Sequence, residues 1–371
     1  MNKIVHYSKL IRPGGGPAGY LYNLEVACFD SQRVEVRYEE RLDSRAKPSN
    51  SKTRKNNTLK DLRRAFSDFK RIFKGKSFPT LKDVEGSVII FHGVGEALLF
   101  LNHKDNLNSN NKYYLMMHSP VPPHIELASD TGNGIVKKLR IYLLRKIESR
   151  CLRKIDCLVV PNINAIDNYY SDQPKLRALL ESKDYKEIPT GIEAIDTTNF
   201  PSRNTVLSSI NVNPDNIVVG YFGRFILDKG FDNFKTIVEG TSIKDITFIS
   251  AGEGDLPSPK NQNYINLGWR SDALELINAV DYVLVPNNVA YFDLIILEAI
   301  SMGKRVITTY VGGSKKLKKG AVNYLYLDKN LPLQFDNILN DNNWPKDEEI
   351  KNIHKKYYSS KSFKNSFEQL I

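Results

Sequence analysis

An arginine and a lysine lie five positions apart in the stretch GYFGRFILDKGFD, residues 220–232. Arg224 follows the apolar run Ile217–Phe222, and Lys229 precedes a segment with apolar residues at helical spacing, 230–239. The start of a helix exposes amide donors and the positive end of the helix dipole, which together favour phosphate. An arginine fork beside a lysine point charge suits a diphosphate. The pair therefore predicts an anion site, and two solvated loop cations are the alternative.

A glutamate occupies an otherwise apolar, helix-like segment. Glu298 lies within residues 294–302, between Leu297 and Ala299. A carboxylate among apolar neighbours is costly unless it is hydrogen-bonded. The hydroxyl groups of a ribose would satisfy it, and a solvent-exposed position on the edge of the helix is the alternative.

In the first half of the chain, glycines and histidines also follow apolar runs, as Arg224 does in the second half. Residues 14–19 read GGGPAG and lead into a helix-like segment, so their amides could approach an oxyanion closely. The loop is not GxGxxG and no suitably spaced acid follows it, so it gives little support to a NAD site, and a flexible turn is the alternative. His92 and His118 each follow an apolar run. We interpret His92 as structural, since an isolated histidine in such a place is usually a satisfied polar residue.

These residues follow short apolar runs that alternate with helix-length segments. Continuous apolar strands alternating with helices indicate parallel sheets that are covered on both faces. The carboxyl ends of parallel strands lie at one edge of a sheet, where ligands bind, so the candidate residues are predicted to share a rim. The runs predicted as strands are Lys3–Tyr7, Ser87–Phe91, Tyr113–Met117, Cys157–Val160, Ile217–Phe222, Ile246–Ser250, Asp281–Val285 and Arg305–Thr309.

The strand pattern restarts at Ile217, after a polar stretch that contains several prolines. A chain of 371 residues is also long for a single core. We therefore predict an α/β architecture of two doubly wound, Rossmann-like domains facing a central cleft. The boundary is placed near Pro189–Gly191, which gives an N-terminal domain of residues 1–190 and a C-terminal domain of residues 191–349.

Cysteine content and hydropathy favour a soluble cytoplasmic protein. Cys28, Cys151 and Cys157 are odd in number and lack CxxC spacing, so neither a disulfide framework nor a zinc site is indicated. The first residues are too short an apolar stretch for a signal peptide. No run reaches the roughly 18 apolar residues of a membrane-spanning helix.

The formal net charge of +11 is concentrated in two segments of the first half. Residues 52–76 carry ten Lys or Arg against two Asp, and residues 137–154 carry eight against one Glu. Basic amphipathic helices would suit an anionic membrane surface, and the alternative is that their apolar faces pack on the core. No nucleic-acid partner is expected, because no recognised motif is present. Apolar residues near helical spacing are Leu59, Leu62, Phe66, Phe69 and Phe73 in the first segment and Ile141, Leu144, Ile147 and Leu152 in the second.

Six short motifs follow one another in the second half of the chain and resemble a known family. They are similar to the carboxyl-terminal domain of glycosyltransferase family 4 (glycosyl transferases group 1), which are retaining enzymes of the GT-B fold. The resemblance covers roughly residues 217–313, and the glycine loop and His118, within LMMHSP, fit it too. The motifs are Gly223-Arg224 with Lys229-Gly230, Ala251–Gly254, Asn266–Trp269, Ala279–Asp281, Leu294–Gly303 and Gly312-Gly313.

The resemblance implies a site for a nucleotide-diphosphate sugar and a role for each matching residue. Arg224 and Lys229 would neutralise the diphosphate leaving group and, with His118 near the reacting sugar, form the catalytic set. Fixed cations stabilise the departing charge, and the chain has no DxD pair, so neither a metal nor another cofactor is expected. The last helix, about 350–371, would pack back on the first domain. The other donor-binding residues would be Gly15 and Gly16 at the phosphates, Trp269 and Arg270 at the base, Tyr291, Phe292, Asp293 and Leu294 at the sugar and its phosphate, and Glu298 at the ribose.

One position departs from the family pattern. The family has a glutamate eight residues before Glu298, where this chain has Ala290. That glutamate normally helps to hold the donor sugar, and Asp293 could supply a carboxylate with different geometry. The departure puts the identity of the sugar in doubt and leaves a degenerate, non-catalytic relative as an alternative.

The leading hypothesis is a metal-independent, retaining glycosyltransferase of bacterial surface polysaccharide biosynthesis, such as that of O-antigen (lipopolysaccharide) or capsule. The donor would be a nucleotide sugar, with UDP preferred over GDP from family frequency. The acceptor would be a glycan or a polyisoprenyl-diphosphate-linked oligosaccharide at the inner face of the plasma membrane, where the protein would be peripheral. The rival hypothesis is a non-catalytic, glycosyltransferase-like subunit that binds a sugar nucleotide or a partner enzyme.

Overall fold

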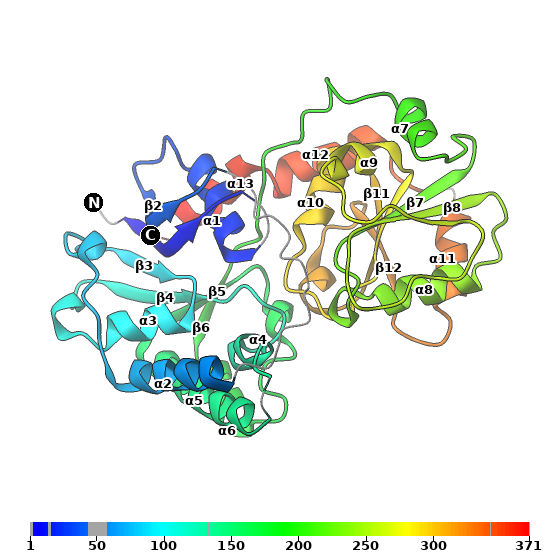
Figure 1. Ribbon diagram of the computed structural model, residues 1–371. Coiled ribbons are helices and arrows are strands. Elements are labelled where there is room, and N and C mark those ends of the chain that lie inside the picture. The colour runs from blue at the N-terminus through cyan, green and yellow to red at the C-terminus, as the bar shows by residue number, and fades with distance from the viewer. Residues whose placement is uncertain (1–2, 14–15, 44–57, 133, 342, 371) are drawn as a thin grey trace. The chain divides into compact units, whose positions relative to one another are not determined.

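The computed structural model describes residues 3–13, 16–43, 58–132, 134–341 and 343–370. The chain divides into two compact units, residues 1–189 with 363–371 and residues 190–362 (Figure 1).

The N-terminal unit is built on a six-stranded parallel sheet (Figure 1). Its strand order is β2-β1-β3-β4-β5-β6, so β1 and β3 are the neighbours at which the order reverses. The strands are β1 (Ile4–Ile11), β2 (Val34–Arg41), β3 (Val88–Phe91), β4 (Lys112–Met116), β5 (Cys157–Val160) and β6 (Asp184–Glu187).

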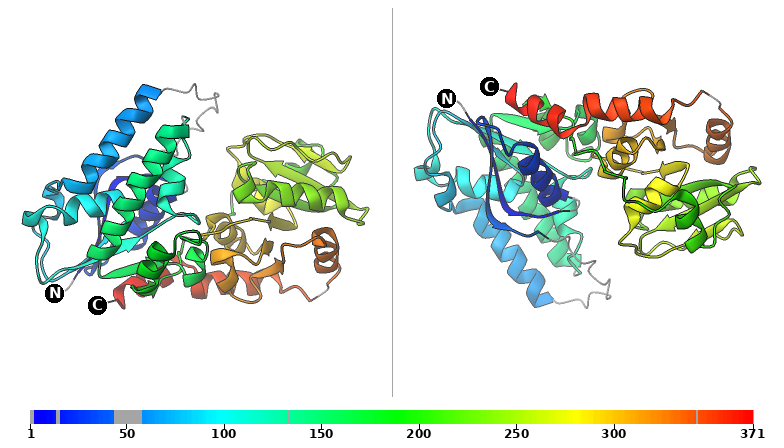
Figure 2. Two further views of the ribbon diagram at one scale, coloured as in Figure 1. Left: turned by 90° about the horizontal axis from the view of Figure 1, so that it is seen from below. Right: turned by 90° about the horizontal axis from the view of Figure 1, so that it is seen from above.

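Helices cover both faces of this sheet. On one face, α1 (Gly16–Ala27) and the end of α13 (Ser360–Glu368) pack into a core that includes Leu21, Ile90 and Phe363. On the other face, the Phe91 ring contacts Phe100 of α3 at a centroid distance of 5.0 Å. The helices α2 (Thr58–Phe73) and α5 (Gly134–Lys154) lie side by side outside α3 (Val94–Leu101), as Figures 1 and 2 show. The shorter helices α4 (Pro123–Ala128) and α6 (Pro174–Glu181) complete this unit.

The C-terminal unit has a second six-stranded parallel sheet. Its order, β12-β11-β10-β7-β8-β9, is the Rossmann order with the reversal between β7 and β10. The strands are β7 (Ile217–Phe222), β8 (Ile246–Ala251), β9 (Tyr264–Asn266), β10 (Tyr282–Val285), β11 (Arg305–Thr309) and β12 (Val322–Leu325).

Alternate residues of these strands enter two separate cores. Val218 and Val283 pack with α7 (Arg203–Ser209), α9 (Ala273–Ala279), α10 (Leu294–Ser301) and α12 (Asp347–Tyr357). Val219 and Leu284 pack on the opposite face with α8 (Phe231–Gly240) and α11 (Leu331–Leu339). Such alternation confirms the predicted doubly wound α/β architecture, since both faces of the sheet are covered.

The C-terminal helices divide between the two units. Helix α12 contacts α10 in the C-terminal unit, and only the chain from Phe363 onward groups with the N-terminal unit. Within the segment 350–371, the chain from residue 363 groups with the N-terminal unit and the preceding part groups with the C-terminal unit.

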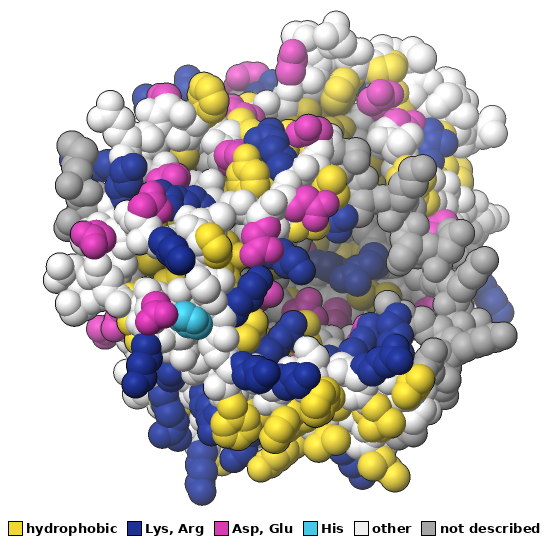
Figure 3. Space-filling model, turned by 60° about the vertical axis from the view of Figure 1, so that its left-hand side comes forward, with side chains coloured by type: hydrophobic (Ala, Val, Ile, Leu, Met, Phe, Trp, Pro, Cys, Tyr) yellow, Lys and Arg dark blue, Asp and Glu magenta, His cyan; other side chains and the backbone are white. Residues whose placement is uncertain are grey.

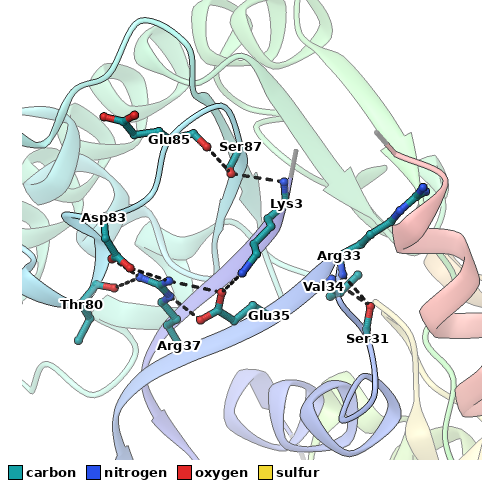
Figure 4. A network of polar contacts seen from close by, with 10 residues as sticks. All are labelled: Lys3, Ser31, Arg33, Val34, Glu35, Arg37, Thr80, Asp83, Glu85 and Ser87. Atoms are coloured by element: carbon teal, nitrogen blue, oxygen red, sulfur yellow. Dashed lines mark hydrogen bonds and ion pairs between the residues drawn. The ribbon is translucent and has the colours of Figure 1, made fainter. Parts of the chain in front are cut away.

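All eight runs predicted as strands are strands, and the four strands that the sequence did not indicate are the outer strands of the two sheets: β2, β6, β9 and β12. Charged side chains occupy β2, where Arg37 donates to Glu35 at 2.7 Å and to Asp83 and the Thr80 carbonyl at 2.6 Å (Figure 4). Charges on an outer strand discourage pairing with another chain.

No helix in the described ranges is both long and apolar enough to cross a bilayer.

Two glycines with nearly identical positive φ angles form a matched pair for testing the close approach of the loops after β7 and β10. Gly230 has φ +62° and Gly268 has φ +63°. A Cβ at Gly230 would lie 1.7 Å from the Pro286 carbonyl oxygen, whereas a Cβ at Gly268 would meet no atom within 4 Å. Gly268→Ala is expected to lower the free energy of unfolding by about 1 kcal/mol through backbone strain alone. Gly230→Ala is expected to lower it by about 3 kcal/mol, because overpacking adds to that strain.

Urea unfolding followed by tryptophan fluorescence measures this difference. Both tryptophans of the chain, Trp269 and Trp344, lie in the C-terminal unit, so the signal reports on it. Equal losses for the two variants would show that the Gly230 turn can move away from β10.

Candidate functional site

The loops that leave β7 and β10 are joined where the order of the second sheet reverses. Asn288 donates from its backbone to the Asp228 carbonyl at 3.2 Å and from its side chain to the Leu227 carbonyl at 2.8 Å. The Asn233 side chain, in the first turn of α8, donates to the Pro286 carbonyl at 2.9 Å. These contacts fix the short helical turn Leu227–Lys229 against the end of β10.

Lys229 occupies a defined position within this junction. Its Nζ forms an ion pair with Asp293 Oδ1, and Asp293 Oδ2 accepts a hydrogen bond from Asn287 Nδ2 at 2.6 Å. Asn287 is 1% exposed, and its carbonyl accepts from Thr309 Oγ1 at 2.5 Å. The Lys229 side chain remains 33% exposed, so a positive charge is held in place yet stays accessible to solvent.

Arg224 lies close to Lys229 along the chain and is exposed. Its guanidinium makes no ion pair with any residue in the described ranges. The buried Tyr221 hydroxyl donates to the Arg224 carbonyl at 2.7 Å and reaches the Lys229 carbonyl at 3.2 Å. Burial raises the pKa of Tyr221, so its phenol keeps the proton it donates. One hydroxyl therefore fixes the backbone of both cationic residues.

The loop after β8 packs tightly against the Arg224 loop. A Cβ at Gly252 would lie 1.8 Å from the Gly223 carbonyl oxygen, and Phe225 donates from its backbone to Glu253 at 2.9 Å. Glycine is required here because the two backbones touch. The Ala251–Gly254 motif thus has a structural role in positioning Arg224.

Ala290 is buried beneath the Gly312–Gly313 turn. Gly313 donates from its backbone to the Ala290 carbonyl at 2.9 Å, and a Cβ at Gly312 would approach that carbonyl to 2.1 Å. Ala290 itself is 2% exposed. The departure from the family glutamate therefore falls on a closely packed segment of the backbone.

The residues after Ala290 lead into α10. Tyr291 is buried, which raises the pKa of its hydroxyl, and Phe292 packs near Tyr358 at a ring distance of 6.2 Å. Asp293 stands before the first residue of the helix, Leu294. Its carboxylate makes no capping bond to the helix because it faces Lys229 and Asn287.

Glu298 lies on α10, and Trp269 and Arg270 are neighbours in the loop after β9. Glu298 is half-buried on α10, between the fully buried Leu297 and Ala299. Trp269 is 53% exposed. The Arg270 guanidinium donates to Asp272 at 2.8 Å, and this contact raises the pKa of Arg270. Its side chain is therefore already paired, which leaves its backbone for any contact with a base.

Two of the predicted site residues of the N-terminal unit are described. Gly15 lies outside the described residues, and Gly16 is an exposed glycine with φ +74° at the start of α1. His118 follows β4, and its Nε2 lies 2.7 Å from Nδ1 of His92. His92 was a second candidate at the rim and was interpreted as structural, and no role was predicted for His6.

The structure thus brings Arg224, Lys229 and Asp293 together at the end of the second sheet. Two cations against one carboxylate, next to the amino end of α10, can bind a multiply charged anion such as a diphosphate. Sequence reasoning placed the loop of Asn287 at the predicted rim but gave this residue no role in the site. Its signal was its place directly after a buried strand, in the sequence Pro286-Asn287-Asn288.

This site lies within the part of the chain that matches a known family model. Residues 216–339 match the family model described as Glycosyl transferases group 1. An uncharacterised 42.6 kDa protein in the cps region of Klebsiella pneumoniae is 24% identical over 60% of this chain and 55% of its own length. A UDP-Gal:alpha-D-GlcNAc-diphosphoundecaprenol alpha-1,3-galactosyltransferase of Escherichia coli is 30% identical over 28% of this chain and 30% of its own length. The chain thus aligns with about half or less of these relatives.

Solved structures share the fold over the whole chain. Sucrose-phosphate synthase from Thermosynechococcus elongatus has a TM-score of 0.64 at 15% identity and covers 100% of this chain and 98% of its own. Anabaena HepE in complex with UDP has a TM-score of 0.62 at 14% identity and covers 99% of both chains. The resemblance inferred from the motifs is confirmed as far as these comparisons reach: the protein has the GT-B fold, and its residues 216–339 match the Glycosyl transferases group 1 family model.

Proposed function

We propose that the protein is a retaining glycosyltransferase of bacterial surface polysaccharide biosynthesis. It moves a sugar from a nucleotide-diphosphate sugar, with UDP preferred over GDP, to a glycan or lipid-linked oligosaccharide. The single observation that carries the proposal is the held Lys229 ammonium beside the exposed Arg224, at the strand reversal of the family domain. The cps-region relative, the diphosphoundecaprenol galactosyltransferase and the UDP complex of HepE support the pathway, the acceptor class and the nucleotide.

The chemistry assigned to the site is stabilisation of a leaving group. Cleavage of the sugar–phosphate bond builds negative charge on the diphosphate, and preorganised cations stabilise that charge most where it develops. Arg224 and Lys229 supply the cations in this proposal, and the half-buried Glu298 accepts hydrogen bonds from the ribose. No metal or other cofactor is assigned a role. The leaving phosphate takes the proton of the acceptor, which attacks from the same face of the sugar.

Replacement of Arg224 tests the anion site with little risk to the fold, because its side chain is exposed and makes no described ion pair. Arg224→Ala is expected to weaken UDP binding about tenfold to a hundredfold, the usual size of a charge-assisted hydrogen bond. Lys229→Ala is expected to lower transfer as well and also to reduce stability, because Asp293 loses its partner. Isothermal titration with UDP and a UDP-release assay with candidate UDP-sugars measure the two effects.

Lys319→Ala provides the matched control, since Lys319 is an exposed cation of the same unit. If Arg224→Ala and Lys229→Ala both bind UDP and turn over substrate as the wild type does, the assignment of these residues to the anion site is wrong. UDP binding without release of UDP or sugar transfer by the wild-type protein, across donors and lipid-linked acceptors, would favour the non-catalytic subunit instead.

Replacement of Asp293 gives a separate prediction, because a carboxylate at the anion site has two opposing effects on the binding of a diphosphate. It holds Lys229, but it also repels a diphosphate. Asp293→Asn keeps the side-chain shape and removes the charge, so we expect UDP to bind about fivefold more tightly at low salt, with the gain reduced at high salt. Asp215→Asn is the control, since Asp215 is exposed and precedes the amino end of β7. Weaker UDP binding by Asp293→Asn would mean that positioning of Lys229 outweighs the repulsion.

The exposed surface of α2 supports the proposal that the acceptor is embedded in a membrane. Leu59, Phe66 and Phe73 are about 60% exposed, while the same helix buries Asp61 and Asp68. Figure 3 shows hydrophobic side chains bordered by Lys and Arg over the α2 and α5 side of the N-terminal unit. The complete exposed stripe of α2 is Leu59, Leu62, Phe66, Phe69 and Phe73.

Polar contacts hold α2 in this orientation. Asp68 Oδ2 accepts a hydrogen bond from Arg140 Nε at 2.9 Å, and Arg140 also donates to Thr131 at 2.7 Å. Asp61 accepts from the Gly132 amide at 3.1 Å. A helix that buries its acids and exposes its apolar side chains beside cations fits an anionic lipid surface.

The second basic segment divides between core and surface. Leu144, Ile147 and Leu152 of α5 are buried and Ile141 is half-buried, so this predicted apolar face packs on the core. Other apolar residues of α5 are exposed instead, namely Ile135, Leu139 and Tyr142.

The double variant Phe66→Gln/Phe69→Gln tests membrane docking. Wild-type protein is expected to co-sediment with vesicles that contain phosphatidylglycerol and far less with pure phosphatidylcholine. The double variant should bind the anionic vesicles at least about tenfold more weakly, because two half-exposed rings no longer enter the lipid. Leu333→Gln, an exposed apolar residue of the C-terminal unit, serves as the control. Sedimentation that does not depend on anionic lipid, or that is unchanged in the double variant, would remove the membrane proposal.

A further inference from the structure

Three tyrosine rings contact one another at one edge of the second sheet. Tyr310 directly follows β11, Tyr326 directly follows β12, and Tyr324 lies within β12, the outermost strand. The centroid of the Tyr310 ring lies 5.4 Å from that of Tyr326 and 5.2 Å from that of Tyr324. Tyr310 is 42% exposed and Tyr326 is 56% exposed. We call these three residues the tyrosine platform.

Hydrogen bonds hold the platform in place. The Gln334 side chain of α11 accepts from the Tyr326 amide at 2.8 Å and donates to the Tyr326 carbonyl at 3.0 Å. The Tyr324 hydroxyl donates to the Ser314 carbonyl at 2.7 Å. A ligand that stacks on these rings therefore has few protein groups to order when it binds, which favours affinity.

The platform lies on the same edge of the sheet as the anion site. Ligands of doubly wound sheets bind outside the carboxyl ends of the strands, and β11 is the neighbour of β10. The turn after Tyr310 packs on the candidate site, where the Gly313 amide donates to the Ala290 carbonyl at 2.9 Å. Arg224 and Lys229 belong to the loop after β7, so the platform is separate from the anion site although both lie on one rim.

Two lysines lie beside the loop that supports the platform. The Tyr324 hydroxyl reaches the carbonyl of Leu317 at 3.4 Å, and Lys318 is the next residue. The ammonium groups of Lys318 and Lys356 both lie on the Tyr357 ring, at 4.7 and 5.0 Å from its centroid. Both lysines are exposed, and neither forms an ion pair with a described residue. Two ammonium groups that share one ring and have no described acidic partner attract an anion.

These features together fit a saccharide chain that carries acidic groups. The C–H faces of a sugar ring stack on exposed aromatic rings, and its hydroxyls find partners in the tyrosine hydroxyls. Tyrosine supplies a large contact area with only two side-chain torsions to fix. Residues 310–318 include three lysines and no Asp or Glu, so carboxylates or phosphates on the chain would find cations. An apolar protein partner would instead bury these hydroxyls and ammonium groups without partners.

We propose that the tyrosine platform, together with Lys318 and Lys356, forms a binding surface for an acidic polysaccharide chain. The binding itself follows from the geometry of the C-terminal unit alone. Its role rests on the proposed function, because the bound chain is then the glycan on which the enzyme acts.

Binding to polysaccharides of known charge tests this proposal in the full-length protein. Polygalacturonate, in which every sugar carries a carboxylate, is the acidic probe, and dextran of similar length is the neutral one. Microscale thermophoresis is expected to show polygalacturonate binding that weakens at high salt, and dextran binding that is at least about tenfold weaker. Equal binding of dextran would contradict the acidic class. Tighter binding of oligothymidylate than of polygalacturonate would show that the surface takes stacked bases, and would overturn the saccharide class.

Replacement of the most exposed ring tests the platform. Tyr326→Ala is expected to weaken polygalacturonate binding about tenfold, because the stacking surface is lost. Tyr326→Phe keeps the ring and should bind within about threefold of the wild type. Tyr185→Ala is the control, since Tyr185 is 49% exposed on β6 of the N-terminal unit. Unchanged binding by Tyr326→Ala, or an equal loss in the control, would overturn the proposal.

A pair of double variants tests the lysines. Lys318→Ala/Lys356→Ala is expected to lower the affinity for polygalacturonate about tenfold and to reduce its dependence on salt. Lys244→Ala/Lys260→Ala is the matched control, because these exposed lysines of the same unit change the net charge equally. Equal losses in the two double variants would mean that a basic protein attracts any polyanion, and would overturn the assignment of these lysines.

UDP titration separates this inference from the proposed function. Tyr326→Ala should bind UDP within about twofold of the wild type, because the ring lies outside the anion site. Protein that binds UDP and transfers sugar but binds no polygalacturonate would contradict only the present inference. Protein that binds polygalacturonate at the platform but binds no UDP would contradict only the proposed function.

Discussion

The ion pair between Lys229 and Asp293 is the contact on which the candidate site depends. It joins the loops after β7 and β10, two strands that are adjacent in space but separated by about sixty residues of chain. Buried hydrogen bonds support the geometry of this ion pair, because Asn287 is buried, donates to Asp293 and accepts from Thr309. A carboxylate that is only 10% exposed is costly unless it is paired. The same constraint that keeps the two loops together therefore keeps the lysine ammonium in place.

The central strands could be predicted from the sequence because burial on both faces makes them continuously apolar. Val88–Phe91 and Cys157–Val160 are buried at every residue. The outer strands have one open edge and lack that signal: Asp184–Glu187 is exposed throughout, and Val34–Arg41 alternates charged residues. Pairing with an already formed neighbour makes these segments strands, and no local pattern encodes it. The four outer strands therefore lay beyond what the sequence could indicate.

Residues of the candidate site could be predicted where a single residue follows a buried strand. They could not be predicted where the position of a side chain depends on the partner with which it pairs. Arg224 and Lys229 lie where their positions after β7 suggested. The pairing of Arg270 with Asp272 and the burial of Asp68 against Arg140 depend on partners that spacing does not reveal. Helix α2 shows this limit of sequence-based prediction, since it has the expected apolar periodicity but its apolar stripe is exposed to solvent. Periodicity gives the faces of a helix, and only its contacts decide which face is buried.

The cations of the candidate site keep contact with water or with a carboxylate. Arg224 is exposed, and Lys229 is paired with Asp293 while its side chain stays 33% exposed. A departing diphosphate requires full charges, and cations that are already held in place need little reorganisation when that charge develops.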